Sequence, residues 1–251
     1  MILEIDDLHF SYVKHEEILH GVSCKIETGK LTAIIGPNGC GKTTMVKCIN
    51  KIHAPSAGKI LFNGEDLVHC ARSTIAKRIG YVPQVSSEGL GGTVIDFILL
   101  GRRQYLSWKL RAEDLRAVLD VLEKLNIAHL ANKNYGELSG GQKQKVLVAR
   151  ALLQQPEMFL FDEPTSNLDL KNQLEIMELA RGIVDHEHKT AVIVVHDLNM
   201  ALHYADHVIL MEAGRIVCTG IPNDVLTVSN IEKVYGVHAF VEECGYVNPF
   251  H

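Results

Sequence analysis

One segment of the sequence reads Gly36-Pro37-Asn38-Gly39-Cys40-Gly41-Lys42-Thr43-Thr44 and matches the pattern G-x-x-x-x-G-K-[ST] at every position. It follows an apolar run, Leu31 to Ile35, and precedes a predicted helix, Lys42 to Asn50. A strand, a glycine-rich loop and a helix in this order are typical of a phosphate site, because glycines let backbone N–H groups approach phosphate oxygens and the helix N-terminus adds free donors. The segment therefore predicts binding of a nucleoside triphosphate, rather than a glycine-rich turn without a ligand.

Side chains of this loop have separate predicted roles. Lys42 should reach the β- and γ-phosphates, and the Thr43 hydroxyl should bind Mg²⁺. Cys40 stands beside Lys42 and the helix N-terminus, both of which favour a thiolate. We therefore expect a lowered pKa and a reactive thiol at Cys40, with a sterically shielded thiol as the alternative.

The composition limits the class of protein. A chain of 251 residues with 47% hydrophobic residues suits one large α/β domain, or a domain with a subdomain. The formal net charge of −5 gives no basic footprint for nucleic acid. Acids stand where a signal peptide is basic, and no apolar run approaches the roughly 20 residues of a membrane helix. The cysteines are scattered without a C-x-x-C pair, so neither a zinc site nor a disulfide framework is predicted. We expect a protein of the cytoplasm.

Two kinds of strand are predicted. Short β-rich runs indicate antiparallel strands at residues 2–5, 10–13, 22–26 and 59–62. Runs that are apolar at every position indicate strands buried on both faces of a parallel sheet, at Leu31–Ile35, Met158–Phe161 and Ala191–Val195. These runs end at the phosphate loop, at Asp162 and at His196. Because open α/β sheets bind ligands at the carboxyl ends of their strands, we expect the site there.

The middle of the chain is predicted to be helical. Residues 112–126 have an amphipathic pattern, and residues 142–153 read as another helix. The apolar face of the first helix comprises Leu115, Val118, Leu119, Leu122 and Leu125. We predict a nucleotide-binding core with an antiparallel β portion at residues 1–84 and 150–220, an inserted helical subdomain at 85–149, and a tail of short helices and loops at 221–251.

Two adjacent carboxylates follow the apolar run that ends at Phe161. Asp162 would hold Mg²⁺, directly or through water. Glu163 would polarise the attacking water, as a general base or by orienting it. The alternative is a pair of exposed acids at a strand end, which the phosphate loop in the same chain disfavours.

A second anion site is predicted at Leu138-Ser139-Gly140-Gly141-Gln142. A Ser-Gly-Gly turn that opens a helix offers a hydroxyl, free N–H groups and a helix dipole. The economical arrangement of two phosphate cradles per chain places each nucleotide between the phosphate loop of one subunit and this turn of another, in a head-to-tail homodimer. The alternative is that Ser139 merely caps a helix.

In this order and spacing, the motifs resemble those of the ATP-binding subunits of ABC transporters over nearly the whole chain. By this resemblance, Gly36–Thr44 is similar to the Walker A motif, residues 159–162 to Walker B with Glu163 as the catalytic carboxylate, residues 138–142 to the signature, and residues 166–169 to the D-loop. The resemblance implies a P-loop NTPase fold, with a mixed, mostly parallel sheet between helices.

The same resemblance implies roles for three more residues. Gln84 resembles the Q-loop glutamine, which can touch Mg²⁺ or water, and His196 resembles the switch histidine that contacts the γ-phosphate. Tyr12 resembles the aromatic residue that stacks on adenine. Taken singly, these would be a loop amide, a core histidine and a half-buried strand residue.

Three stretches resemble importers of iron–siderophore, haem and vitamin B12. They are Leu99–Arg103 with Tyr105 and Trp108, His196–Ala201 with Tyr204–Asp206, and Pro222–Thr227 with Val234–Val237. Gln104 stands where a proline is commoner, and Gly89–Gly92 is unusually rich in glycine, both near the expected membrane contact. The resemblance implies an ATPase that uses ATP and Mg²⁺, a homodimer with ATP at its interface, permease subunits, and indirectly a substrate-binding protein, at the cytoplasmic face of the membrane.

Other functions stay open. Molybdate and tungstate importers have similar subunits. Soluble ABC ATPases of DNA repair or translation usually carry coiled-coil or zinc insertions or two tandem cassettes, and a nucleotide kinase would not explain Ser139–Gly141 or Glu163.

The apolar residues of the segment after Gln84 either line a groove for a permease helix or pack the helical subdomain; they are Val94, Ile95, Phe97, Ile98 and Leu99.

Overall fold

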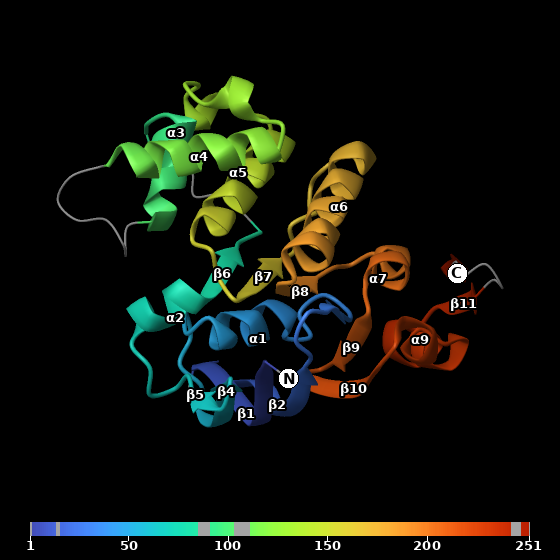
Figure 1. The fold of residues 1–251 in the computed structure, drawn as a ribbon. Coiled ribbons are helices and arrows are strands. Elements are labelled where there is room, and N and C mark those ends of the chain that lie inside the picture. The colour runs from blue at the N-terminus through green and yellow to red at the C-terminus, as the bar shows by residue number, and fades with distance from the viewer. Residues whose placement is uncertain (1, 14–15, 85–90, 103–110, 242–246, 251) are drawn as a thin grey trace.

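The computed structural model describes residues 2–13, 16–84, 91–102, 111–241 and 247–250 (Figure 1). The predictions made for Gly89, Gln104, Tyr105 and Trp108 concern residues outside these ranges. Among the described helices, none is long and apolar enough to cross a membrane.

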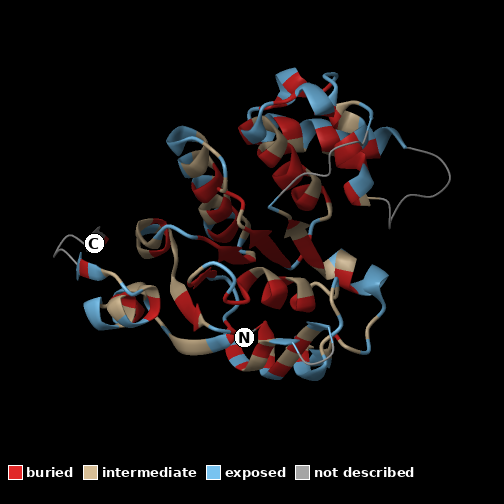
Figure 2. Cartoon of the chain, turned by 180° about the vertical axis from the view of Figure 1, so that it is seen from behind, coloured by how far each residue is buried: buried red, intermediate tan, exposed pale blue. Residues whose placement is uncertain are grey.

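A central sheet carries the phosphate loop. In the described ranges it has six strands in the order β10-β9-β3-β8-β7-β6, and neighbouring strands are parallel except β10, which pairs antiparallel to β9. Its strands are β3 Leu31–Ile35, β6 Ile79–Val82, β7 Met158–Asp162, β8 Thr190–Val194, β9 His207–Glu212 and β10 Arg215–Gly220. Every residue of β3, β7 and β8 is buried (Figure 2), as their continuous apolar runs predict.

Side chains of the central sheet alternate between two hydrophobic cores. In β7, Phe159 and Phe161 join the core beneath helices α5 (Gly140–Leu153) and α6 (Leu170–Glu187). Met158 and Leu160 face the other core, which contains residues of α1 (Lys42–Ile49) and of a second sheet. The helices therefore cover both faces, because every strand presents apolar side chains to both sides.

The second sheet is antiparallel, with strand order β2-β1-β4-β5. Its strands are β1 Leu3–Val13, β2 Glu16–Ile26, β4 Ala57–Phe62 and β5 Glu65–Asp66. The prediction of separate strands at 2–5 and 10–13 is wrong, because both belong to β1. Asp7 has a positive φ of 49°, and the pairing with β2 shifts between Ile5 and Leu8. This bulge accommodates the polar residues that interrupt the apolar pattern.

The helical region lies beyond the end of the sheet (Figure 1). After α2 (Arg72–Arg78) and β6, it contains α3 (Val94–Leu99), α4 (Ala112–Lys124) and α5, with short 3₁₀ turns at Leu100–Arg102, Ala128–Leu130 and Tyr135–Glu137. On α4, Val118 and Leu122 are buried, whereas Leu115 and Leu119 are 39% and 44% exposed. The apolar face is thus narrower than predicted. The boundaries of the inserted subdomain, 85 and 149, stay a prediction.

The tail contains a hairpin that the sequence did not predict. After α7 (Leu198–Tyr204), α8 (Pro222–Val225) and α9 (Val228–Tyr235), strands β11 (His238–Val241) and β12 (Val247–Phe250) pair antiparallel. Ala239 and Val247 bury against Ile231 of α9. The Asn199 side chain accepts from the Val247 N–H at 2.7 Å and donates to its carbonyl at 3.1 Å. The hairpin depends on these contacts with distant residues, so short-range patterns miss it.

Gly58 tests the β1–β4 contact. Its φ is 90°, and an added Cβ would lie 2.2 Å from the Asp7 carbonyl oxygen. Gly29 has a φ of 70° with no described atom within 4 Å of an added Cβ, so it is a matched control. We expect Gly29→Ala to cost about 1–2 kcal/mol of unfolding free energy, and Gly58→Ala about 3 kcal/mol or more, by urea denaturation. Equal losses would contradict the steric argument.

Candidate functional site

The phosphate loop is packed so closely that it requires glycine. Gly36 has a φ of 149°, and a Cβ there would lie 2.1 Å from the Met211 carbonyl oxygen of β9. Gly41 has a φ of 105°, and its Cβ would lie 2.8 Å from Leu19 of β2. At Gly39, by contrast, a Cβ would meet no described atom within 4 Å. The loop is therefore fixed from behind by both sheets and open at Gly39, where a phosphate can approach.

Lys42 places a buried positive charge against this loop. Its side chain is 4% exposed, and Nζ donates to the carbonyl oxygens of Gly36 and Pro37 at 2.8 and 2.9 Å. Among the described residues, no side chain caps the N-terminus of α1, so its first N–H groups are available to an anion. The arrangement suits a phosphate group.

Asp162 is held between two hydroxyl groups at the end of β7. Thr43 Oγ1 donates to Oδ1 at 2.7 Å, and Tyr81 Oη donates to Oδ2 at 2.9 Å. The carboxylate is 1% exposed. Burial, and then the charge of Asp162, raise the pKa of Tyr81. A hydroxyl and a buried carboxylate beside a phosphate loop are the oxygen donors that Mg²⁺ prefers, so these residues fit that ion.

Glu163 gathers the other predicted catalytic residues. Its Oε2 accepts from Gln84 Nε2 at 2.6 Å, lies 2.8 Å from His196 Nε2, and accepts from Ser166 Oγ at 3.2 Å. Glu163 has a φ of 50°, a left-handed conformation that turns the chain directly after the strand. The structure thus brings together Gln84, Glu163 and His196, which are far apart in the sequence.

A cavity of about 280 Å³ joins these groups. It is lined by Tyr12, Ile18, Gly39, Gly41, Lys42, Thr43, Thr44 and Glu163. Tyr12 is 55% exposed, and its hydroxyl lies 3.2 Å from Thr44 Oγ1 and 3.3 Å from His53 Nε2. An exposed aromatic residue tethered to the phosphate loop can stack on a base.

The signature turn lies outside this cavity. Ser139 caps α5, since its Oγ accepts from the Gln142 N–H at 3.4 Å while Gln142 Oε1 accepts from the Ser139 N–H at 3.1 Å. Cβ atoms added to Gly140 and Gly141 would lie 3.5 Å from Leu168 and 2.3 Å from Asn172. The simple helix cap is therefore present, beside the D-loop of the same chain.

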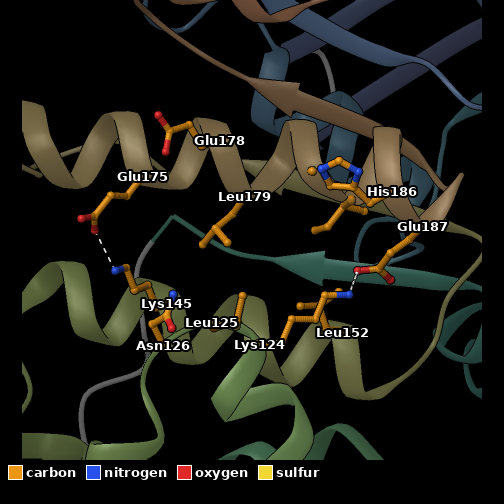
Figure 3. A pocket seen from close by; sticks show the side chains of 12 residues that line it. Lys124, Leu125, Asn126, Lys145, Leu152, Glu175, Glu178, Leu179, His186 and Glu187 are labelled. Carbon is orange, nitrogen blue, oxygen red and sulfur yellow. Dashed lines mark hydrogen bonds and ion pairs between the residues drawn. The ribbon is translucent and has the colours of Figure 1, made fainter.

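A larger cavity, of about 530 Å³, lies between α4, α5 and α6 (Figure 3). Leu125, Leu152 and Leu179 contribute its apolar part, and the ion pairs Lys145–Glu175 and Lys124–Glu187 bridge it at 2.7 and 2.5 Å. Among its described lining residues are none of the predicted site residues. The smaller cavity is the candidate nucleotide site, because its lining contains residues of the phosphate loop and Glu163.

Comparison with known proteins gives the family. The model of the ABC transporter family matches residues 19–166, which is more than half of the chain. The chain belongs to the ABC transporter family. It is an ATP-binding subunit and an ATPase of that family, as its motifs predict.

The alignments with several curated relatives cover most of both proteins. An uncharacterized ABC transporter ATP-binding protein of Methanocaldococcus jannaschii is 43% identical over 242 residues, covering 96% of this chain and 94% of that protein. The ferric enterobactin transport ATP-binding protein of Escherichia coli is 35% identical, with coverage of 94% and 88%. The hemin import ATP-binding protein of Rhizobium meliloti is 38% identical, with coverage of 88% and 86%.

Solved structures confirm the predicted α/β fold of P-loop NTPase type. An inward-facing metal-chelate type ABC transporter matches with a TM-score of 0.86 and 28% identity, over 100% of this chain and 97% of that one. A dimeric ATP-binding cassette bound to ADP and phosphate matches with a TM-score of 0.78 and 28% identity, over 88% and 99%.

Two residues of this ABC ATPase were missed by sequence reasoning. Sequence reasoning assigns no role to Tyr81, and it includes Ser166 only as the first residue of the D-loop. For Tyr81 the deciding fact is the β6–β7 register: Tyr81 pairs with Leu160, and so lies on the same face of the sheet as Leu160 and Asp162.

Most of the apolar segment after Gln84 packs the helical region. Within the described part of this segment, Val94, Phe97, Ile98 and Leu99 are buried, and Ile95 is partly buried against the same core. Only the simple packing alternative is therefore supported for these residues. Leu100, which follows them, is 44% exposed.

The expected lowering of the Cys40 pKa is wrong. The thiol is 4% exposed, and burial raises its pKa despite the opposing effect of Lys42, whose Nζ lies 4.0 Å from Sγ. A side chain facing the back of the loop loses more from desolvation than it gains from a charge already shared with two carbonyl groups.

A raised pKa predicts slow alkylation of Cys40 at neutral pH, because little thiolate is present there, and faster reaction as the pH rises. We expect iodoacetamide to label Cys40 of the folded protein at least about tenfold more slowly than in urea. Peptide mass spectrometry can follow the labelling of Cys40, with the partly exposed Cys70 as the comparison. Labelling of Cys40 at pH 7 as fast as that of an ordinary exposed thiol would restore the original prediction.

Proposed function

We propose that this chain is the ATP-hydrolysing subunit of an ABC importer that drives uptake of a metal chelate, of the iron–siderophore, haem or cobalamin type, through a membrane permease. The observation that carries the enzymatic part is the convergence of Gln84, His196 and Ser166 on Glu163, beside the phosphate loop. Names of relatives that transport ferric enterobactin and hemin support the choice of cargo.

In the proposed site, ATP occupies the smaller cavity. Tyr12 stacks on adenine, the backbone of Gly36–Thr44 binds the phosphates, and Lys42 turns from the loop carbonyls toward the β- and γ-phosphates. Thr43 and Asp162, with Gln84 nearby, would hold Mg²⁺, which supplies charge neutralisation at the phosphates when bound. Two of the contacts involved, Thr43 with Asp162 and Tyr12 with Thr44, are already present in the structure.

Glu163 then serves as the carboxylate that orients and polarises water. Gln84, His196 and Ser166 all contact Oε2, and the residue lines the cavity, so their contacts fix where the carboxylate points. His196 would contact the γ-phosphate from the same side. Catalysis here depends on positioning, because phosphoryl transfer requires in-line geometry more than covalent chemistry from the protein.

The signature turn acts on a second subunit in this proposal. Ser139, Gly140, Gly141 and Gln142 lie outside the chain's own cavity, so they complete a site only across an interface. The similar cassette that is dimeric and bound to ADP and phosphate supports a homodimer. ATP would close the dimer, and hydrolysis would open it. The chain would sit at the cytoplasmic face of the membrane, held there by the permease, with exposed Leu100 in the region of contact.

An oxyanion cargo is the second candidate. Phosphonates import ATP-binding proteins of Alcaligenes faecalis and Nitratidesulfovibrio vulgaris are 34% and 36% identical to this chain. This likeness supports the oxyanion class that also includes molybdate and tungstate. Uptake assays in vesicles that contain the permease and its substrate-binding protein distinguish metal-chelate cargo from oxyanion cargo. ATPase activity that never co-purifies with a permease would instead favour a soluble ABC ATPase.

Glu163→Gln tests the catalytic assignment. The amide keeps the shape of the side chain but loses the charge that polarises water, so we expect ATP turnover to fall about 100-fold or more while ATP binding persists. Because hydrolysis separates the subunits in this proposal, an ATP-bound dimer should accumulate on size-exclusion chromatography. Glu178→Gln, in the larger cavity, is the control and should keep turnover. Near-normal turnover in Glu163→Gln would remove Glu163 from this role.

Mixed dimers test the shared site. Gly140→Asp adds a negative charge to the signature turn, and the added Cβ makes only an ordinary van der Waals contact with Leu168. A substitution at Gly141 would instead collide with Asn172. Lys42→Ala disables the phosphate loop. We expect neither variant alone to hydrolyse ATP, and their mixture to recover activity, because one of the two sites combines an intact loop with an intact turn. No recovery in a mixture that forms dimers would argue against nucleotide binding between subunits.

A further inference from the structure

Tyr81 reaches the predicted metal ligand from a neighbouring strand. Its partner in the β6–β7 pairing is Leu160, two residues before Asp162, which is roughly 7 Å along a strand. The ring packs against the same core as Leu160, on the face that contains α1. A tyrosine side chain spans this diagonal, so its hydroxyl meets Asp162 Oδ2 at 2.9 Å.

The two hydroxyl contacts of Asp162 divide its carboxylate into two sides. Thr43, in the phosphate loop, donates a hydrogen bond from Oγ1 to Oδ1 at 2.7 Å. Tyr81, on β6, donates to Oδ2 from the other side. A free carboxylate can rotate and offer either oxygen to a cation. With Oδ2 held by Tyr81, Oδ1 is the oxygen that faces Thr43 and the phosphates.

We propose that Tyr81 is a positioning residue for the metal site: its hydroxyl fixes the Asp162 carboxylate so that Oδ1 and Thr43 Oγ1 together face the cation that accompanies ATP. This inference rests on the proposed function, in which Thr43 and Asp162 hold Mg²⁺. Partners that orient a metal ligand commonly change metal affinity 10–100-fold when removed.

The location of Tyr81 strengthens the assignment. In the described part of the chain β6 is an edge strand that pairs with β7 alone, and Gln84, just beyond its end, donates to Glu163 at 2.6 Å. One short strand and its continuation therefore contact two adjacent carboxylates, Asp162 at the end of β7 and Glu163 directly after it. Tyr81 acts on the one assigned to the metal, and Gln84 on the one assigned to water.

Tyr81→Phe keeps the ring and its packing but removes the hydroxyl. The probe is Mn²⁺, whose binding to the protein with a non-hydrolysable ATP analogue is titrated by electron paramagnetic resonance. We expect Mn²⁺ affinity to fall about tenfold or more, and the metal-free affinity for the nucleotide to stay within about twofold. Tyr135→Phe, which removes another buried hydroxyl within the helical region, is the matched control and should leave both affinities unchanged.

Asp162→Asn and Thr43→Ala separate the inference from the proposed function. If these variants lose Mn²⁺ while Tyr81→Phe binds it like the unmodified protein, the role of Tyr81 is refuted and the metal site stands. If all three bind Mn²⁺ normally, the metal site itself is misplaced. A Tyr81→Phe protein that unfolds, or that loses nucleotide binding without metal, would also refute the inference, because the hydroxyl would then support the fold.

Discussion

Burial of β3, β7 and β8 on both faces confines polar chemistry to the ends of these strands. Every residue of these strands is buried, and their side chains alternate between two apolar cores. Lone polar groups within such strands would be costly unless paired. The phosphate loop and Asp162 therefore occupy the carboxyl ends of β3 and β7, and His196 follows β8, so the parallel arrangement brings them together.

The backbone places the two adjacent carboxylates, Asp162 and Glu163, in different surroundings. Asp162 is the last residue of β7 and is buried between the hydroxyls of Thr43 and Tyr81. Glu163 adopts a left-handed conformation, leaves the strand and meets Gln84, His196 and Ser166. The turn at Glu163 thus separates two chemically similar side chains, one suited to a cation and the other to a water molecule.

The signature turn follows a different constraint from the rest of the site. It begins α5, whose buried residues join the core between the helices and the central sheet, and Gly141 fits closely against Asn172 near the D-loop. The helical region is further tied to α6 by the ion pairs Lys145–Glu175 and Lys124–Glu187. These contacts hold the turn outside the cavity of its own chain, which is the physical basis for proposing a site completed by a second subunit.

The sequence by itself determined the phosphate loop, the apolar strands and the order of the motifs, because each depends on residues that are neighbours in the chain. It also named Glu163, Gln84 and His196 as candidate catalytic residues, whereas the contacts between them come only from the fold. Tertiary structure alone decided the pKa direction of Cys40, the continuity of β1, the tail hairpin and the bond from Tyr81 to Asp162. Each of these depends on which distant groups surround a residue: burial outweighs the charge of Lys42 at Cys40, and a neighbouring strand supplies the hydroxyl that orients Asp162.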